Sequence, residues 1–130
     1  MFDLGKILSG KRWEIMEILR EEKRPSELSS ILKITRQGVD KHLSILEKYL
    51  LIKKLKKGGK VFYVLSDNGK FLMNKIMEIN SKYIDKIKND YYFEKNSIEN
   101  LFKNGKLEKN EFEEKLNNLI LKYSIFFGKI

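Results

Sequence analysis

SELSSILKITRQGVDKHLSILEKYL, residues 26–50, has the pattern of two short helices joined by a tight turn. In the second half of this stretch, apolar side chains recur at spacings of four, three and four, the period of one helical face. At 100° per residue they lie within about 60° of one another, so we expect this face to be buried. Its members are Val39, Leu43, Leu46 and Leu50.

The opposite face of the same predicted helix is polar. It carries Gln37, Lys41, Ser44 and Lys48, with Arg36 near the helix start. Two acidic residues, Asp40 and Glu47, lie at its flank. A polar helix that follows a short helix and a turn is typical of a helix-turn-helix, whose second helix enters the major groove of DNA.

The residues before this stretch predict further short helices. Residues 2–8 are apolar and predict a short helix that packs on the body or on a partner subunit. Residues 9–22 predict a second helix, capped by Ser9 and stopped by the single proline, Pro25. We expect Ser26 to cap the next helix, which extends to about residue 32, and Thr35 to cap the polar helix.

A β-hairpin is predicted directly after the polar helix. Two β-rich runs within residues 52–65 flank Gly58-Gly59, a strong signal for a two-residue turn with positive φ. A lysine run is usually only a solvated face, but beside a helix-turn-helix it favours a wing that grips the DNA backbone. The lysines of this ribbon are Lys53, Lys54, Lys56, Lys57 and Lys60.

A long helix is predicted from Ser66 or Asp67 to about Tyr92. Its apolar residues cover an arc of about 160°, which is wider than one packing surface requires. We therefore favour a homodimer through this helix; the alternative is that the C-terminal segment covers it. The dimerisation residues proposed are Leu72, Ile76, Ile79, Tyr83, Ile84 and Ile87.

Residues 97–130 predict a helical hairpin. Ser97 would cap one short helix, Asn104-Gly105 would end it, and Asn110 would open another helix through Tyr123. The expected fold is mostly α with a small β-hairpin (α+β). Its parts are a DNA-binding domain (1–66), a dimerisation helix (67–93) and a C-terminal hairpin (94–130).

The charge of the chain is basic and uneven. The formal net charge is +9, with 15 Lys and Arg against 8 Asp and Glu in residues 1–66, and 12 against 10 in residues 67–130. The surplus in the first half favours a polyanionic partner bound there. A generally lysine-rich proteome is the other explanation of the same composition.

Several functional classes are disfavoured by residue content. Cysteine is absent, which excludes disulfides and thiolate metal sites and is compatible with the cytosol. No signal sequence and no apolar run of the ~20 residues that span a bilayer is visible. His42 is the single histidine, so neither a metal site nor a Ser-His-acid triad is expected. We expect a cytoplasmic non-enzyme without cofactor, metal or membrane contact.

With these residues in view, residues 8–69 resemble winged helix-turn-helix transcription regulators of the ArsR/MarR-like kind. The segments that carry the resemblance are ILSGKRWEIMEIL, TRQGVDKHLSILEKYLLI and GGKVFYVLSDNG. The chain departs from metal-sensing members because it has no cysteine pairs. It also has Asp40 in place of a small polar residue, and Tyr49-Leu50-Leu51 in place of a glycine-containing turn. Residues 101–116 faintly resemble the C-terminal oligomerisation modules called SHOCT, which implies self-association.

The resemblance implies a homodimer that binds double-stranded DNA and assigns a role to each polar residue. Arg36, Gln37, Lys41 and Ser44 would face the major groove. Asp40 would accept a hydrogen bond from a cytosine amino group or repel phosphate, and His42 would be structural or touch phosphate. Ser26 and Thr35 would position backbone contacts, and Lys56, Lys57 and Lys60 would bind phosphates.

The sequence leaves two other functions open. One is a sequence-tolerant architectural DNA-binding protein, consistent with the lysine excess and Asp40. The other is a winged-helix adaptor whose apolar helices bind a different protein. A small-molecule effector is unknown, because no polar constellation marks a ligand pocket.

Overall fold

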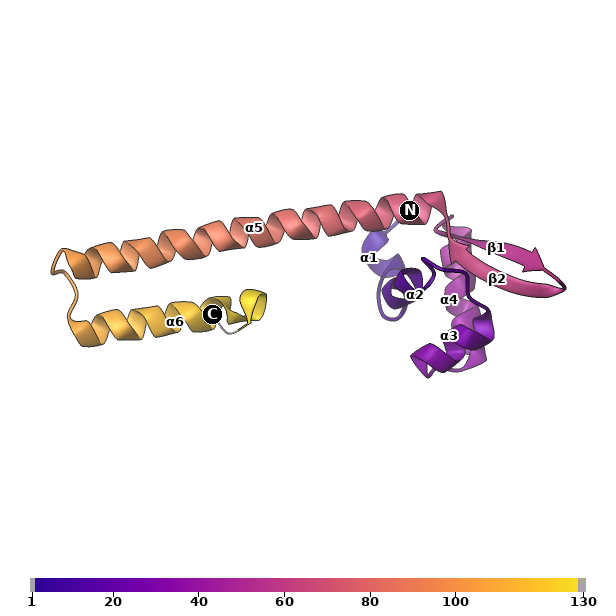
Figure 1. The fold of residues 1–130 in the computed structure, drawn as a ribbon, viewed down its shortest axis with the longest axis horizontal. Helices are drawn as coiled ribbons and strands as arrows, with labels where there is room; N and C mark the ends of the chain where they lie inside the picture. Colours follow the sequence, from indigo (N-terminus) through magenta and orange to yellow (C-terminus); the bar gives the residue numbers. More distant parts are fainter. Residues whose placement is uncertain (1, 129–130) are drawn as a thin grey trace. The chain divides into compact units, whose positions relative to one another are not determined.

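The computed structural model describes residues 2–128. Within them the chain forms six helices and one two-stranded antiparallel sheet, so the predicted fold class is confirmed (Figure 1). In chain order the elements are α1 (Leu4–Ile7), α2 (Arg12–Ile18), α3 (Pro25–Leu32), α4 (Arg36–Lys48), β1 (Ile52–Lys57), β2 (Lys60–Leu65), α5 (Asp67–Lys103) and α6 (Lys109–Phe127).

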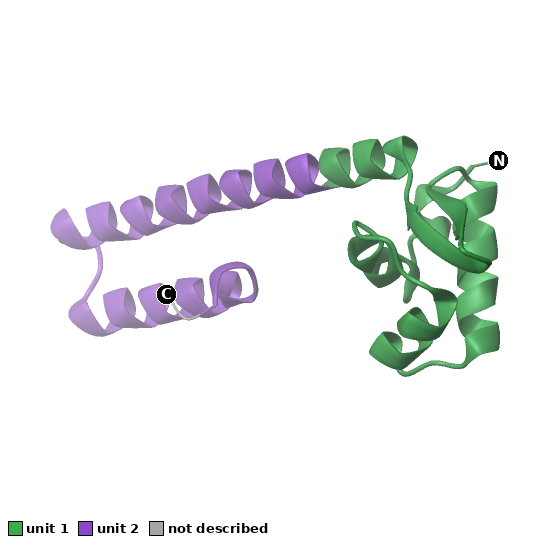
Figure 2. Ribbon diagram, turned by 45° about the vertical axis from the view of Figure 1, so that its right-hand side comes forward, with its two compact units in different colours: residues 1–76 green, residues 77–130 purple. Residues whose placement is uncertain are grey.

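The chain divides into two compact units, residues 1–76 and residues 77–130 (Figure 2). The division falls within α5, whose first turns belong to the first unit and whose remainder belongs to the second. The first unit therefore holds the helix-turn-helix and the wing. The second unit holds most of α5 together with α6.

The helix-turn-helix consists of α3 and α4. The turn between them uses Lys33 in the left-handed region, at φ 55°, and Thr35 caps α4 by accepting a hydrogen bond from the Gly38 amide at 3.0 Å. This cap agrees with the prediction for Thr35. The buried face of α4 brings Val39, Leu43 and Leu46 into the core. The remaining buried residues of this core are Ile7, Ile15, Met16, Leu19, Leu28, Leu51, Ile52, Tyr63, Leu65 and Met73.

Leu50 does not belong to the buried face of α4, contrary to the prediction. The helix ends at Lys48, and Leu50 takes φ 65° with 64% of its surface exposed. This conformation is the one that glycine adopts readily and that costs other residues about 1 kcal/mol or more. The chain thus leaves α4 through a residue in the left-handed region, and that residue is a leucine and not a glycine.

The start of α3 also differs from the prediction. Arg24 is the N-cap residue, and Pro25 occupies the first helical position, where its fixed φ and missing N–H are tolerated. The Glu27 carboxylate accepts a hydrogen bond from the Arg24 amide at 3.0 Å, closing the first turn. Ser26 is therefore the second residue of the helix and not its cap.

Helix α2 is shorter than the predicted span of residues 9–22. It starts at Arg12, and Gly10 precedes it with φ 65°. After Ile18 the backbone pairs with the wing: the Leu19 carbonyl accepts from the Leu65 amide at 2.7 Å, and Lys23 exchanges two hydrogen bonds with Tyr63. These tertiary hydrogen bonds engage the backbone of residues that follow Ile18, where the last turn of the predicted helix was expected.

The wing has the predicted two-residue turn. Gly58 and Gly59 both have positive φ, 56° and 75°, and β1 pairs with β2 in the register Lys57 opposite Lys60. Along β2, Tyr63 and Leu65 are buried whereas Phe62 and Val64 are only half buried. One face of the wing therefore packs on the rest of the first unit.

Helix α5 begins where it crosses the backbone of Leu51. The Ser66 hydroxyl accepts from the Gly69 amide at 3.0 Å, as an N-cap does, and donates to the Leu50 carbonyl at 2.7 Å. A Cβ on Gly69 would lie 2.1 Å from the Leu51 carbonyl oxygen. Glycine is required there because the start of α5 touches the backbone of the segment that joins α4 to β1.

The predicted break in the long helix is absent. α5 runs without interruption from Asp67 to Lys103, and Ser97 lies inside it, where its hydroxyl donates to the Phe93 carbonyl at 3.0 Å. After a loop with Gly105 at φ 73°, α6 starts at Lys109 and continues to Phe127, beyond the predicted end at Tyr123. The C-terminal hairpin therefore pairs α6 with the later part of α5.

The core of the second unit is small. Tyr91 of α5 and Leu119 and Tyr123 of α6 are buried. The partly buried residues packed on them are Ile87, Ile98 and Phe127. Helix α6 therefore covers the later part of α5. This agrees in part with the alternative prediction that the C-terminal segment covers the long helix.

Candidate nucleic-acid interface

The polar face of α4 points into solvent. Arg36, Gln37, Lys41 and Ser44 are all exposed, on the side of the helix away from Val39, Leu43 and Leu46. The helix lies at the surface of the first unit, held by its apolar face and by the Thr35 cap. Its polar side chains are therefore available for contact with a partner.

Arg36 is joined to Asp40 one turn later. The Arg36 Nε atom donates to Asp40 Oδ1 at 3.2 Å, and both side chains are 57% exposed. An exposed pair of this kind contributes at most about 1 kcal/mol to stability. Its larger consequence is geometric, because Asp40 engages Nε while bidentate recognition of guanine uses the ends of the guanidinium. Asp40 thus restrains Arg36, a role different from the two that were predicted for it.

Gly38, inside the first turn of α4, has a local explanation. A Cβ at this position would lie 3.2 Å from the Thr35 hydroxyl oxygen that caps the helix. The absent side chain leaves room for the cap, which fixes where α4 begins.

His42 contacts the N-terminal segment through Arg12. The Arg12 Nη1 atom lies 3.2 Å from His42 Nδ1, and the same guanidinium donates to the carbonyls of Lys6, at 2.7 Å, and Ile7. Because arginine can only donate, Nδ1 must be the unprotonated nitrogen of a neutral ring. Burial first, and then the charges of Arg12 and Lys41, lower the pKa of His42. His42 therefore has a structural contact, one of the two roles that were expected of it, with Arg12 as its partner.

The wing lysines are divided between the two faces of the hairpin. The register places Lys54 and Lys56 on the side of the buried Tyr63, and the Lys54 ammonium lies 5.8 Å from the centre of the Tyr63 ring. Lys53 lies on the opposite side, and Lys57 and Lys60 pair beside the turn. These lysines are exposed, as the prediction of phosphate contacts by Lys56, Lys57 and Lys60 requires.

Lys57 has an acidic partner that the sequence did not indicate. Its ammonium lies 2.7 and 2.8 Å from the two carboxylate oxygens of Glu22, in the connection between α2 and α3. The two residues are 35 positions apart, so only the tertiary fold brings them together. A phosphate that binds Lys57 must compete with Glu22.

The remaining predicted contact residues lie at helix starts. Ser26 is exposed in the first turn of α3, and Thr35 is exposed at the start of α4 with its hydroxyl engaged by Gly38. Both positions suit contacts to a phosphate backbone, because helix N-termini carry unpaired N–H groups. Thr35 already uses its side-chain oxygen as a cap.

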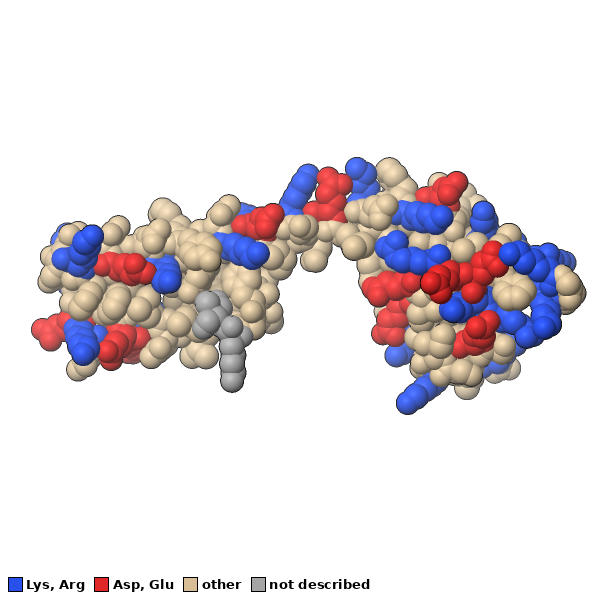
Figure 3. Space-filling model, viewed as in Figure 1, with Lys and Arg blue, Asp and Glu red and all other residues tan. Residues whose placement is uncertain are grey.

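The two units differ in charge. Residues 1–76 contain 17 Lys and Arg against 9 Asp and Glu (+8), whereas residues 77–130 contain 10 against 9 (+1). Figure 3 shows lysine and arginine gathered over the wing, and mixed signs over the C-terminal hairpin. The positive charge is therefore concentrated on the unit that carries α4.

The residues predicted for dimerisation occupy different environments. Ile79 and Tyr83 are exposed, whereas Leu72 packs on the first core and Ile87 packs on the second. Ile76 and Ile84 are half buried. Ile79 and Tyr83 are thus the members of this set with most surface left for a partner.

Two other kinds of site find no support in residues 2–128. No cluster of His, Asp and Glu in this part of the chain has the arrangement of a metal site. None of its helices combines the length and the apolar character that a bilayer crossing demands.

The chain is similar over part of its length to solved winged-helix transcription regulators. HlyU from Vibrio cholerae matches over 57% of this chain and 83% of its own length, with 29% identity and a TM-score of 0.50. HlyU from Vibrio vulnificus matches over 58% and 80%, with 25% identity and a TM-score of 0.50. A transcriptional regulator homologue from Pyrococcus horikoshii has the same fold over 65% and 90%, at 23% identity and a TM-score of 0.57.

These neighbours confirm the predicted resemblance to ArsR-like winged-helix regulators. The neighbours are transcription regulators and not enzymes. No protein-family profile and no curated protein sequence matches the chain. The resemblance of residues 101–116 to SHOCT modules therefore stays a prediction.

Proposed function

We propose that this protein is a homodimeric, sequence-specific regulator of transcription that binds double-stranded DNA in the cytoplasm. The observation that carries the proposal is the exposed polar face of α4 in a winged-helix unit of charge +8. The fold is that of the transcription regulators named above. Occupation of an operator by the dimer would regulate transcription from the adjacent promoter.

Direct readout is assigned to the start and middle of α4. Gln37 can pair with adenine through its amide, and Arg36 or Lys41 can donate to guanine or to phosphate. Ser44 extends the same exposed face one turn further. Asp40, which holds Arg36 at 3.2 Å, limits the directions in which the guanidinium can point. We assign sequence preference to these residues.

Backbone contacts are assigned to the wing and to the helix starts. Lys56, Lys57 and Lys60 are the wing cations, and Ser26 and Thr35 lie at the N-termini of α3 and α4. Phosphate contacts fix the register of a protein on the duplex but carry no sequence information. In a dimer, two α4 helices would read half-sites about 34 Å apart.

A selection of genomic DNA fragments at two salt concentrations, with the dissociation constants of the selected and scrambled duplexes, tests this proposal. The expected result is enrichment of a pseudo-palindrome. Gln37→Ala should change the preferred sequence, whereas Lys60→Ala should weaken binding to both duplexes equally and reduce the salt slope by about one.

Two other outcomes would redirect the assignment. Tight, steeply salt-dependent binding without any preferred sequence would mean an architectural DNA-binding protein. Absence of binding even at low salt would leave the winged-helix adaptor as the function. If Gln37→Ala and Lys60→Ala changed specific and random binding identically, the division of roles between helix and wing would be wrong.

A further inference from the structure

A groove lies between α5 and α6 within the second unit. It is open to solvent and has a volume of about 430 Å³, which is within the range of small-molecule sites in proteins. Its lining residues on α5 fall within residues 93–98, and on α6 they are Lys115, Asn118, Leu119 and Lys122. At 100° per residue these four side chains lie within about 100° of one another, so one side of α6 forms one wall.

Aromatic contacts between the two helices flank this groove along the chain. Toward the loop, Phe102 of α5 stacks on Phe112 of α6 with ring centroids 4.2 Å apart. Toward the other end, the rings of Tyr91 and Tyr123 meet edge to face at 5.4 Å. These contacts hold the helices apart, and between them the short side chain of Ser97 leaves the groove unfilled. The packing of the hairpin itself thus forms the hollow.

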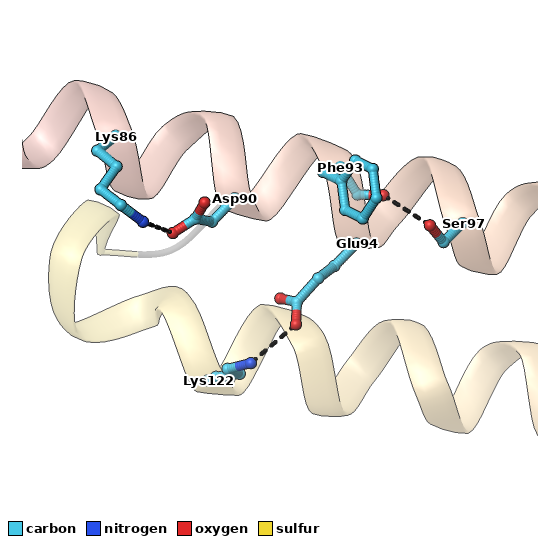
Figure 4. Close-up of polar contacts among 6 residues, drawn as sticks. All are labelled: Lys86, Asp90, Phe93, Glu94, Ser97 and Lys122. Carbon is cyan, nitrogen blue, oxygen red and sulfur yellow. Dashed lines mark hydrogen bonds and ion pairs between the residues drawn. The ribbon is translucent and has the colours of Figure 1, made fainter.

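The carboxylate of Glu94, which also lines the groove, is already engaged. Its Oε1 atom accepts from the Lys122 ammonium at 2.9 Å, as Figure 4 shows, and its Oε2 atom is buried. The Tyr123 hydroxyl and Lys122 lower the pKa of Glu94, so the carboxylate stays ionised at neutral pH. The Ser97 hydroxyl donates to the Phe93 carbonyl of its own helix at 3.0 Å. The Glu94–Lys122 pair therefore adds no net charge to the groove.

Lys115 is the cation of the groove that lacks an acidic partner. Its side chain is exposed, and within residues 2–128 no ion pair joins it to a carboxylate. Asn118, three positions later on the same wall, adds an amide group that can donate hydrogen bonds. An ammonium and an amide donor on one wall are suited to a carboxylate or another small anion.

The remaining surface of the groove is apolar. Leu119 is buried, Ile98 is half buried, and the ring of Phe93 is 74% exposed. An inorganic anion would leave this surface uncovered, and a cationic molecule would be repelled by Lys115. The lining is complementary to a molecule that combines an anionic head with an apolar body.

We propose that this groove binds a small amphipathic organic anion, an alkyl or aryl carboxylate. The carboxylate accepts hydrogen bonds from the Lys115 ammonium and the Asn118 amide, and the apolar body covers Ile98, Leu119 and the ring of Phe93. The site lies wholly within the second unit. Ligand binding there is therefore independent of the proposed contact between the first unit and DNA.

The test titrates the full chain with octanoate, octyltrimethylammonium and octanol, which share an apolar tail and differ in the charge of the head group. Amide chemical shifts of isotope-labelled protein, recorded below micelle-forming concentrations, give both the location and the dissociation constant. Octanoate should shift the amides of Ser97, Ile98 and Leu119. It should also bind at least about tenfold more tightly than octyltrimethylammonium, because only octanoate can accept from Lys115.

Three variants separate the head-group contact from the apolar contact. Lys115→Gln should weaken octanoate binding about tenfold and leave octanol binding unchanged. Lys106→Gln is the matched control, because it removes the same charge from an exposed lysine of the α5–α6 loop that does not line the groove. Phe93→Ala should weaken all three probes by a similar factor. All three side chains are exposed, so helix content by circular dichroism should be unchanged.

Several results would overturn the proposed site. Absence of binding by all three probes, or equal affinities for octanoate and octyltrimethylammonium, would show that the groove does not select amphipathic anions. Shifts confined to the first unit would mean that its charge of +8 attracts octanoate instead. Octanoate affinities that are the same in Lys115→Gln and Lys106→Gln would exclude a specific contact with Lys115.

Discussion

At His42, one ring nitrogen faces a guanidinium, which fixes the proton on the other nitrogen. Burial, Arg12 and Lys41 lower the pKa of this histidine below its ordinary value of 6.5. The unfolded chain therefore takes up a proton at higher pH than the folded chain does. Stability should be unaffected above pH 6.5 and should fall as the pH drops from 6.5 through the lowered folded pKa.

The variant His42→Asn isolates this effect, because its side-chain oxygen can still accept from Arg12 but does not titrate in this range. Urea unfolding at pH 7.5 and pH 5.0 measures the free energy of unfolding of both proteins. We expect wild type to lose more stability than His42→Asn between the two pH values. An equal loss in both would show that His42 titrates alike in the folded and unfolded chains.

The residue scale is also where sequence patterns were least informative. Helical periodicity assigned Leu50 to the buried face, but α4 stops at Lys48 and Leu50 turns outward with φ 65°. Nothing in the local pattern marks this exit, because a leucine occupies a conformation that usually requires glycine. Asp40 illustrates the same limit: its pairing with Arg36 follows the i, i+4 spacing, a signal that was present and not used.

At the element scale, the wing is joined to the connection between α2 and α3 by a salt bridge. Lys57 contacts both oxygens of Glu22, and the backbone of Lys23 pairs with Tyr63 of β2. Glu22 thus neutralises one of the wing cations and places a carboxylate beside the proposed path of the phosphates. Removal of that carboxylate should favour DNA.

Glu22→Gln should tighten binding to specific and scrambled duplexes several-fold and equally, and should steepen the salt slope by about one. The measurement is the dissociation constant at several salt concentrations. Glu21→Gln is the matched control, because Glu21 is the neighbouring exposed acid and pairs with Lys23 at 3.8 Å instead. If the two variants tightened binding by the same factor, general charge and not the release of Lys57 would be responsible.

Most elements, but not all of their ends, were predictable from the sequence. The Gly58-Gly59 turn, the Thr35 cap and the period of α4 are local signals, and the structure has all three. The end of α2 was not predictable, because it is set by hydrogen bonds to residues of β2 that lie 40 or 46 positions later in the chain. The continuity of α5 was predictable: no glycine or proline lies between Gly69 and Gly105, and Ser97 is tolerated mid-helix by bonding the preceding turn.

At the scale of the whole molecule, net charge is divided unequally between the two units. The first unit carries +8 and the exposed polar face of α4, whereas the second carries +1. The unequal charge supports the proposal that a polyanion binds the first unit. The charge imbalance was readable from the sequence. Which apolar residues of α5 and α6 are buried depends on how the two helices pack, and periodicity alone did not resolve that packing.

We propose that the polar face of α4 and the wing contact one duplex together. Hydroxyl-radical footprinting on the selected site tests this joint contact most directly. Wild type should protect a central block in each half-site and a flanking block of backbone. The variant Lys56→Ala/Lys57→Ala/Lys60→Ala, at a concentration that restores occupancy, should lose only the flanking block. Loss of no block, or uniform loss of both, would contradict joint contact by helix and wing.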